Sequence, residues 1–82
     1  MMTARAFLLV ETQVGKTKDV VVALRSQKTK EIKSVDLVTG PYDIIVVVEH
    51  EDVDAIGTLV TDKIHPTPGI TRTVTCLSIR VQ

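Results

Sequence analysis

A short polar turn holds the residues with the clearest potential for ligand chemistry. Thr39, Gly40, Pro41, Tyr42 and Asp43 stand directly before an apolar run. Gly40 can adopt a backbone conformation that exposes successive N–H groups, and such turns bind anions such as a carboxylate. Pro41 has no N–H, so Gly40 and Tyr42 are the nearby donors. Because Asp43 adds an acceptor for an ammonium group, the turn suits a zwitterion such as a free amino acid.

Two threonines near the end of the chain are a second candidate. Thr73 and Thr75 lie one pleat apart on one face of a predicted strand, where their hydroxyls would reach a ligand in a cleft between subunits. Threonine also simply suits a strand. The turn, in the same way, is explained by an ordinary hairpin in which Asp43 bonds its own backbone. Residue chemistry alone leaves both interpretations open.

The other residues capable of chemistry give weaker signals. His50 and His65 fall at opposite ends of a predicted helix, which does not suit a shared metal. Cys76 alternates with Val74, is expected to pack inside, and has no base placed to activate it. The sequence contains no catalytic triad, glycine-rich phosphate loop or Walker pattern. We therefore expect no metal, no cofactor and no catalytic residue.

Composition argues against several classes of function. Of the 82 residues, 44% are hydrophobic but only 2% aromatic, so the core must consist of Val, Ile and Leu. Ten basic and ten acidic residues cancel, and stacking platforms are nearly absent, so direct nucleic-acid binding is not expected. A single cysteine, Cys76, excludes an intrachain disulfide. No apolar run approaches the roughly 20 residues of a membrane span. We expect a cytoplasmic protein without membrane contacts.

The elements that position these residues follow the order βαββαβ. Strands are predicted over residues 4–11, 32–38, 42–49 and 70–81, and helices over 17–26 and from Asp52 or Asp54 to 64. Thr17 is expected to cap the first helix. Gly57 lowers helix propensity by about 1 kcal/mol relative to Ala, so it is expected to allow close approach to the sheet.

This order is the ferredoxin-like split βαβ pattern. It predicts an α+β fold with a four-stranded antiparallel sheet and two helices on one face, within a single domain of residues 1–82. Residues 7–10 and 44–48 are apolar at successive positions, so the central strands need cover on both faces. An uncovered apolar face would invite aggregation. The pattern therefore predicts a dimer whose sheets pack face to face.

Two motifs resemble signatures of the Lrp/AsnC effector domain, also called the RAM domain. Residues 38–45, Val-Thr-Gly-Pro-Tyr-Asp-Ile-Ile, resemble its hairpin signature. Residues 68–75, Pro-Gly-Ile-Thr-Arg-Thr-Val-Thr, resemble its Pro-Gly-Val-like turn leading into a Thr-x-Thr strand. The resemblance covers essentially the whole chain, and the two motifs together are far more specific than either alone. Pro41 occupies a variable position of the motif, and its missing N–H would alter which effector fits.

The resemblance implies the same βαββαβ fold, a dimer built by sheet packing, and rings of dimers such as octamers. It also implies that amino-acid effectors bind in clefts between dimers. Matched by motif, such a cleft would be lined by Gly40, Tyr42 and Asp43, with Thr73 and Thr75 opposite. Full-length regulators of the family carry a helix-turn-helix DNA-binding domain before this module. Because the first predicted strand begins within a few residues of the start, we expect the stand-alone form.

These observations together predict a non-enzymatic module for amino-acid binding and homo-oligomerisation that serves transcription regulation, with full-length Lrp/AsnC-type regulators as further partners. Two alternatives remain open. One is a ferredoxin-like dimeric enzyme of the small-oxygenase or isomerase kind, which needs a titratable residue inside a sizeable pocket; Tyr42 and His65 are its aromatic candidates. The other is a purely structural assembly domain that binds no ligand.

Overall fold

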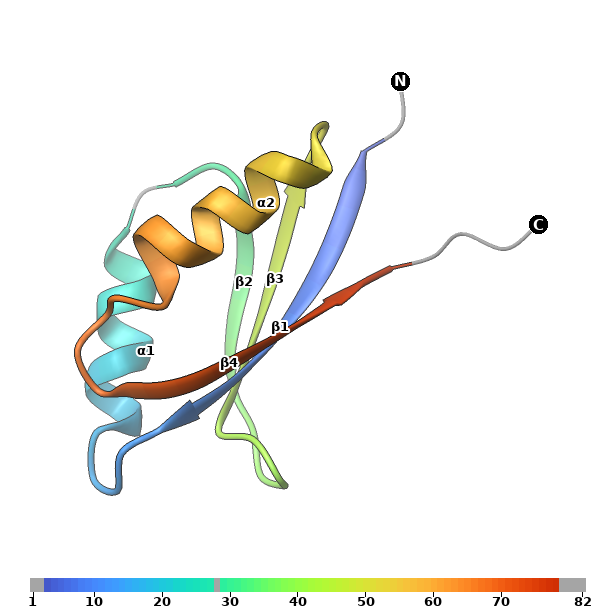
Figure 1. Ribbon diagram of the computed structural model, residues 1–82. Helices are drawn as coiled ribbons and strands as arrows, with labels where there is room; N and C mark the ends of the chain where they lie inside the picture. The colour runs from blue at the N-terminus through green and yellow to red at the C-terminus, as the bar shows by residue number, and fades with distance from the viewer. Residues whose placement is uncertain (1–2, 28, 79–82) are drawn as a thin grey trace.

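The computed structural model describes residues 3–27 and 29–78 of the chain. In chain order its elements are β1 (Ala4–Thr12), α1 (Thr17–Ser26), β2 (Ile32–Leu37), β3 (Ile44–His50), α2 (Val53–Leu59), the π-helical turn η1 (Val60–Ile64) and β4 (Ile70–Leu77). Within this part of the chain, four strands form one antiparallel sheet in the order β2-β3-β1-β4. Both helices cover the same face of the sheet (Figure 1). The predicted ferredoxin-like βαββαβ fold is confirmed.

The hydrophobic core lies between the sheet and the helices. Alternate residues of the two central strands are fully buried there: Ala6, Leu8, Val10, Ile44, Val46 and Val48. From the helical side, Val20 and Leu24 of α1, Ile56 of α2 and Ile64 of η1 belong to the same core cluster. Burial of each such aliphatic side chain contributes about 1.5–3 kcal/mol of hydrophobic stabilisation. The period of two in β1 and β3 thus directs one set of side chains to the helices and the other set away from them.

The first helix begins differently from the prediction. Lys16 occupies the N-cap without a side-chain hydrogen bond, and Thr17 is already the first helical residue. The Thr17 hydroxyl lies 2.7 Å from the hydroxyl of Thr12 instead of capping the helix. The capping prediction was wrong because Thr17 lies inside the first turn of the helix, where its hydroxyl contacts β1. Farther along α1, Arg25 reaches the edge strand β2, where its Nε and Nη2 donate to the carbonyl of Val35 at 3.2 and 2.7 Å.

The second helical segment was predicted as one helix but contains two kinds of turn. Asp52 caps α2, as expected, and its carboxylate accepts from the Asp54 N–H at 2.9 Å. The α-helical turns then give way to the π-helical turn η1, where the His65 N–H donates to the Val60 carbonyl, five residues earlier, at 2.7 Å. Gly57 is exposed, and a Cβ added to it would meet no atom within 4 Å, so the predicted close approach to the sheet was wrong. The neighbouring Ile56 faces the sheet instead.

Strand boundaries shift by a few residues from the predicted ones. The second strand ends at Leu37 and the third begins at Ile44, because the residues between them bend. The last strand ends at Leu77, and residues 79–81 of the predicted strand lie outside the described residues. In the described part of the chain, no helix combines the length and the apolar character needed to cross a membrane.

The face of the sheet that the helices leave uncovered is apolar at its centre. We call this surface the open face and define it by Phe7, Leu9, Ile45, Val47, Val74 and Cys76. Leu9 pairs with Ile45 on one side and Val74 on the other, while Phe7 pairs with Val47 and Cys76. Cys76 is exposed. The prediction that it packs inside was therefore wrong for the single chain, because the helices cover the opposite face.

Two ion pairs bracket the open face. Arg5 Nε lies 3.3 Å from Glu49 Oε2 at one end, and Arg72 Nη1 lies 3.4 Å from Glu11 Oε2 at the other. The Arg5 guanidinium also sits 5.5 Å from the centroid of the Phe7 ring, within cation–π range. Both pairs are substantially exposed, so each contributes only about 0–1 kcal/mol to stability. A polar rim around an apolar centre is typical of an interaction surface.

Candidate functional site

The turn of residues 39–43 joins β2 to β3 and is tied to its neighbours at its base. The Val38 N–H donates to the Asp43 carbonyl at 2.9 Å, which closes the hairpin. The Asp43 N–H donates to the Val10 carbonyl of β1, also at 2.9 Å. At the tip, Gly40 has a φ of 146°, a conformation that other residues rarely adopt. Glycine at this position therefore sets the direction in which the tip amides point.

The tip of the turn keeps backbone donors available. Among the described residues, the N–H groups of Gly40 and Tyr42 have no hydrogen-bond acceptor in the protein. Gly40 is exposed and Tyr42 is half-buried. Two such donors on either side of a proline can accommodate an anionic group.

The Asp43 carboxylate is not bonded within its own turn. Its Oδ2 accepts from the Thr12 N–H at 2.9 Å and from the Thr12 hydroxyl at 3.2 Å. The ordinary hairpin interpretation, in which Asp43 bonds its own backbone, therefore does not describe this turn. For the other carboxylate oxygen, Oδ1, the described residues provide no hydrogen-bond partner. Sequence reasoning missed Thr12 because it lies 31 positions before Asp43.

The predicted threonines lie on a different part of the sheet. Thr73 and Thr75 share the helix-side face of β4, where they pair with Val10 and Leu8 of β1. Thr73 Oγ1 lies 3.3 Å from Nδ1 of His65, whereas Thr75 is exposed. Because β1 separates β4 from β3, one chain does not bring these hydroxyls opposite the turn. The pairing register aligns Thr73 with Val10 and Ile44, so β1 lies between this threonine and the end of the turn.

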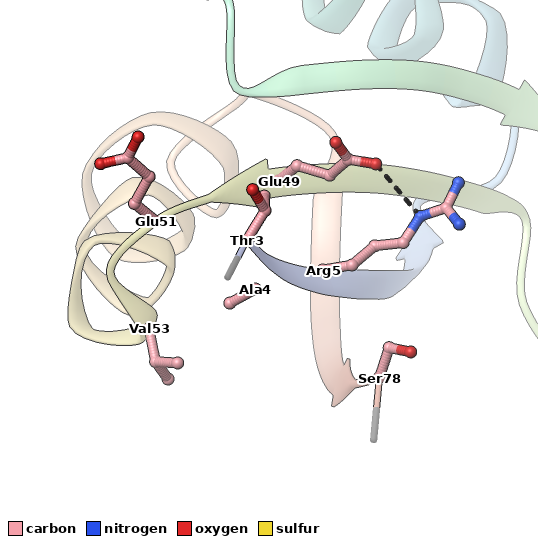
Figure 2. A pocket seen from close by; sticks show the side chains of 7 residues that line it. All are labelled: Thr3, Ala4, Arg5, Glu49, Glu51, Val53 and Ser78. Carbon is pink, nitrogen blue, oxygen red and sulfur yellow. Dashed lines mark ion pairs between the residues drawn. The ribbon is translucent and has the colours of Figure 1, made fainter. Parts of the chain in front are cut away.

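A depression of about 550 Å³ lies at the opposite end of the sheet from the turn. Figure 2 shows its lining, which consists of Thr3, Ala4, Arg5, Glu49, Glu51, Val53 and Ser78. The Arg5–Glu49 ion pair crosses it, and the Glu51 carboxylate points away from that pair (Figure 2). None of the predicted site residues lines this depression. It is therefore separate from the turn.

The titratable aromatic residues Tyr42 and His65 do not line the depression of Figure 2. His50 uses its Nδ1 to accept from the Asp52 N–H at 2.9 Å, so this ring helps to form the start of α2. Within residues 3–27 and 29–78, no group of three or more His, Cys, Asp or Glu side chains is arranged to hold a metal ion. The turn, in contrast, combines two unpartnered backbone donors with a carboxylate within the described residues.

Comparison with known proteins assigns this architecture to a family. The family model described as the Lrp/AsnC ligand binding domain matches residues 5–81, which include both the hairpin motif and the β4 motif. The chain belongs to the Lrp/AsnC ligand-binding domain family. A search of curated proteins finds no match for this Lrp/AsnC domain.

Three solved structures show how this Lrp/AsnC domain relates to known folds. FFRP-DM1 is 34% identical, with a TM-score of 0.83, and the match covers 93% of this chain and 99% of FFRP-DM1. AsnC of E. coli is 20% identical, with a TM-score of 0.85, and the match covers 95% of this chain but 52% of AsnC. A transcriptional regulator of Neisseria meningitidis, solved as a complex with L-methionine, is 21% identical, with a TM-score of 0.78; the match covers 94% of this chain and 50% of the regulator.

The family and these neighbours define the general role of the Lrp/AsnC domain. It is a regulatory effector-binding domain, and the relatives whose names state a function are transcriptional regulators rather than enzymes. The likeness to AsnC and to the Neisseria regulator, at 20% and 21% identity, concerns the fold alone.

Proposed function

We propose that this domain binds a free amino acid at the turn of residues 39–43 and couples that binding to homo-oligomer assembly. The observation that carries the proposal is the combination of unpartnered Gly40 and Tyr42 amides with the Asp43 carboxylate in one turn of the described chain. The amides would donate to the ligand carboxylate, and Asp43 Oδ1 would accept from its ammonium group. The L-methionine bound by the Neisseria regulator supports an amino acid as the ligand class.

The second wall of this ligand site comes from another copy of the chain. In one chain, β1 stands between the turn and the hydroxyls of Thr73 and Thr75. A neighbouring copy that brings its β4 against the turn would supply those hydroxyls. Pro41 and Thr39 would then shape the entrance, with Pro41 contributing bulk but no donor. A ligand held in this way bridges two copies and stabilises their association.

Homodimerisation through the open face is the first level of the proposed assembly. Its central side chains are half-buried in the single chain and would be covered by the same face of a second copy. A self-complementary contact of this kind is the usual basis of two-fold symmetric dimers. Rings of such dimers would bring turns and β4 strands of different dimers together. We propose that this domain affects transcription by forming mixed assemblies with full-length Lrp/AsnC-type regulators. A ligand that prefers one assembly shifts the population toward it, and would thereby change which assemblies the regulators form.

Amino-acid binding is expected to raise the melting temperature of the protein. At a ligand concentration of 100 times Kd, a ligand that binds only the native state adds about 2.7 kcal/mol of stability. Asp43→Asn should abolish the shift, because the ammonium group loses its charged acceptor while the side-chain shape is kept. The measurement is thermal unfolding with a panel of the common amino acids, with light scattering on the same samples.

The control for this experiment is Asp62→Asn, which removes an exposed carboxylate from η1, away from both the turn and the open face. This variant should retain the full shift. A multimeric wild-type protein that shows no shift with any common amino acid would contradict the proposed ligand class. A shift that persists in Asp43→Asn would instead mean that the ligand binds away from the turn.

Thiol reactivity is expected to report coverage of the open face. Cys76 is exposed in the single chain, next to Phe7 on the open face. In the native dimer it should react with an aromatic disulfide reagent much more slowly than in the unfolded protein, because reaction requires access to the thiolate. The rate should rise as the protein is diluted and the dimer dissociates. A fast rate that does not depend on concentration would show that the open face is not the dimer interface.

A further inference from the structure

We propose that Thr12, with Thr17 behind it, is a positioning residue that fixes the Asp43 carboxylate for the ligand. This inference rests on the proposed ligand site at the turn and adds residues to it from two other elements. Thr12 ends β1, Thr17 begins α1, and Asp43 directly precedes β3. Neither threonine belongs to the motifs at the turn or in β4. The hydrogen bonds between them determine how the carboxylate is held.

The direction of each hydroxyl proton follows from the chemistry of the carboxylate. An ionised carboxylate only accepts hydrogen bonds. The Thr12 hydroxyl, 3.2 Å from Asp43 Oδ2, must therefore donate its single proton to that oxygen. Thr12 Oγ1 can then only accept from Thr17 Oγ1, which lies 2.7 Å away. The two hydroxyls form a chain whose protons all point toward the negative charge of Asp43, an arrangement in which the bonds polarise one another.

The backbone of Thr12 provides a second hydrogen bond to the same oxygen, Asp43 Oδ2. The Thr12 N–H donates to Asp43 Oδ2 at 2.9 Å, so Oδ2 receives two hydrogen bonds from one residue. The pairing register of β1 with β4 shifts between Glu11 and Thr12. Such irregularities commonly re-aim a residue at the end of a strand. With Oδ2 fixed at two points, rotation of the carboxylate is restricted.

These hydrogen bonds leave Asp43 Oδ1 as the carboxylate oxygen that is free to accept from a ligand. Oδ2 is occupied by Thr12, and among the described residues Oδ1 has no hydrogen-bond partner in the protein. An ammonium group would therefore meet Oδ1 with its orientation already set. Preorganisation of this kind raises affinity because less conformational freedom is lost on binding. Loss of the Thr12 hydroxyl should leave the Asp43 charge in place but reduce its alignment with the ligand.

The test compares Thr12→Val, which removes the hydroxyl at nearly constant shape, with Thr12→Ser, which keeps it. L-methionine is the probe, and its Kd is measured by titration calorimetry alongside the melting temperature of the ligand-free protein. We expect Thr12→Val to raise Kd about tenfold, equivalent to about 1.4 kcal/mol. The Kd of Thr12→Ser should stay within about twofold of the wild-type Kd. The melting temperatures of ligand-free Thr12→Val and Thr12→Ser should both be close to the wild-type value. Thr17→Val should raise Kd by less than Thr12→Val, because it removes only the outer hydroxyl.

A second measurement does not depend on any ligand. Hydrogen exchange of the Val38 and Asp43 amides, which are both hydrogen-bonded at the base of the turn, is followed by NMR in the ligand-free protein. It should be faster in Thr12→Val than in the wild type or Thr12→Ser. If the wild type does not bind L-methionine, the proposed function fails for this ligand, and the exchange rates still decide whether Thr12 holds the turn. Equal exchange in Thr12→Val and the wild type would overturn the inference. So would an equal rise in Kd for Thr12→Val and Thr12→Ser.

Discussion

Replacing Leu9 with lysine is expected to convert the proposed dimer into a folded monomer. Leu9 lies at the centre of the open face, between Ile45 of β3 and Val74 of β4. A face-to-face dimer would bury the new ammonium group against apolar side chains. An uncompensated buried charge costs about 3–5 kcal/mol. Every 1.4 kcal/mol changes an equilibrium constant tenfold, and a symmetric dimer carries the substitution in both copies, so the dimer Kd should rise by at least about two orders of magnitude.

The fold itself should survive this substitution. In the single chain, Leu9 is half-buried on the face opposite the core, so a lysine there can extend its ammonium group into water. Circular dichroism should therefore show the wild-type secondary structure, while sedimentation velocity shows a monomer.

The matched control introduces the same residue on the far side of the molecule. Val22 is a large apolar residue of α1 with 64% of its surface exposed, and Val22→Lys should leave the dimer intact. A Leu9→Lys variant that still sediments as a dimer would show that the copies associate through a different surface. A monomeric wild-type protein would contradict face-to-face dimerisation directly.

Replacing Gly69 with alanine is expected to destabilise the protein strongly, although it adds only one methyl group. Gly69 has a φ of 100°, where a residue with a Cβ is strained. A Cβ at this position would lie 2.8 Å from Val20 Cγ2 and 3.2 Å from Lys16 Cβ. Backbone strain costs about 1–3 kcal/mol, and overpacking against a buried side chain adds about 1–3 kcal/mol. We expect the free energy of unfolding to fall by about 2–6 kcal/mol.

The position of Gly69 explains why the structure cannot easily relax around the new methyl group. Val20 is fully buried in the core, so its side chain has little room to move. The Gly69 carbonyl also accepts from the Gln13 N–H at 2.8 Å, which ties the loop before β4 to the loop before α1. A shift of Gly69 would disturb both the packing of α1 and this connection.

Gly57→Ala is the matched control for Gly69→Ala. Gly57 is an exposed residue of α2 whose added Cβ would meet nothing within 4 Å. Alanine there should increase the free energy of unfolding by up to about 1 kcal/mol, from helix propensity alone. Urea denaturation of both variants at one protein concentration measures the difference. A Gly69→Ala variant within about 1 kcal/mol of the wild type would show that the loop adjusts without strain.

The order of elements could be predicted from the sequence because local patterns specify it. Apolar runs in β1 and β3, together with the helical spacing of Val20 and Leu24, predicted the observed βαββαβ order. The central position of the two strands that are apolar on both faces was predicted from the same patterns. Asp52 caps α2 as expected, since a cap depends on residues only two positions away.

The features that sequence reasoning missed depend on contacts between distant residues. The Thr12–Asp43 hydrogen bonds join positions 31 apart, and no local pattern marks such a pair. Thr17 does not cap α1 because it lies inside the first turn of the helix, where its hydroxyl contacts Thr12. Cys76 was expected in the interior from alternation alone, but alternation does not reveal which face the helices cover. The meeting of the turn with Thr73 and Thr75 stays a prediction, because it requires more than one chain.

The contact between Arg25 and the edge strand β2 bears on how far this protein can polymerise. A guanidinium that donates twice to the Val35 carbonyl occupies an acceptor that an incoming strand would need. Among the described residues, no side chain guards the backbone of β4 in this way. If the β2 edge is obstructed, another copy can add only to the β4 edge. Once two sheets have joined through their β4 edges, no open edge remains and the extension stops. Continuous edge-to-edge growth of the sheet requires both edges to be open, so we expect Arg25 to hinder it.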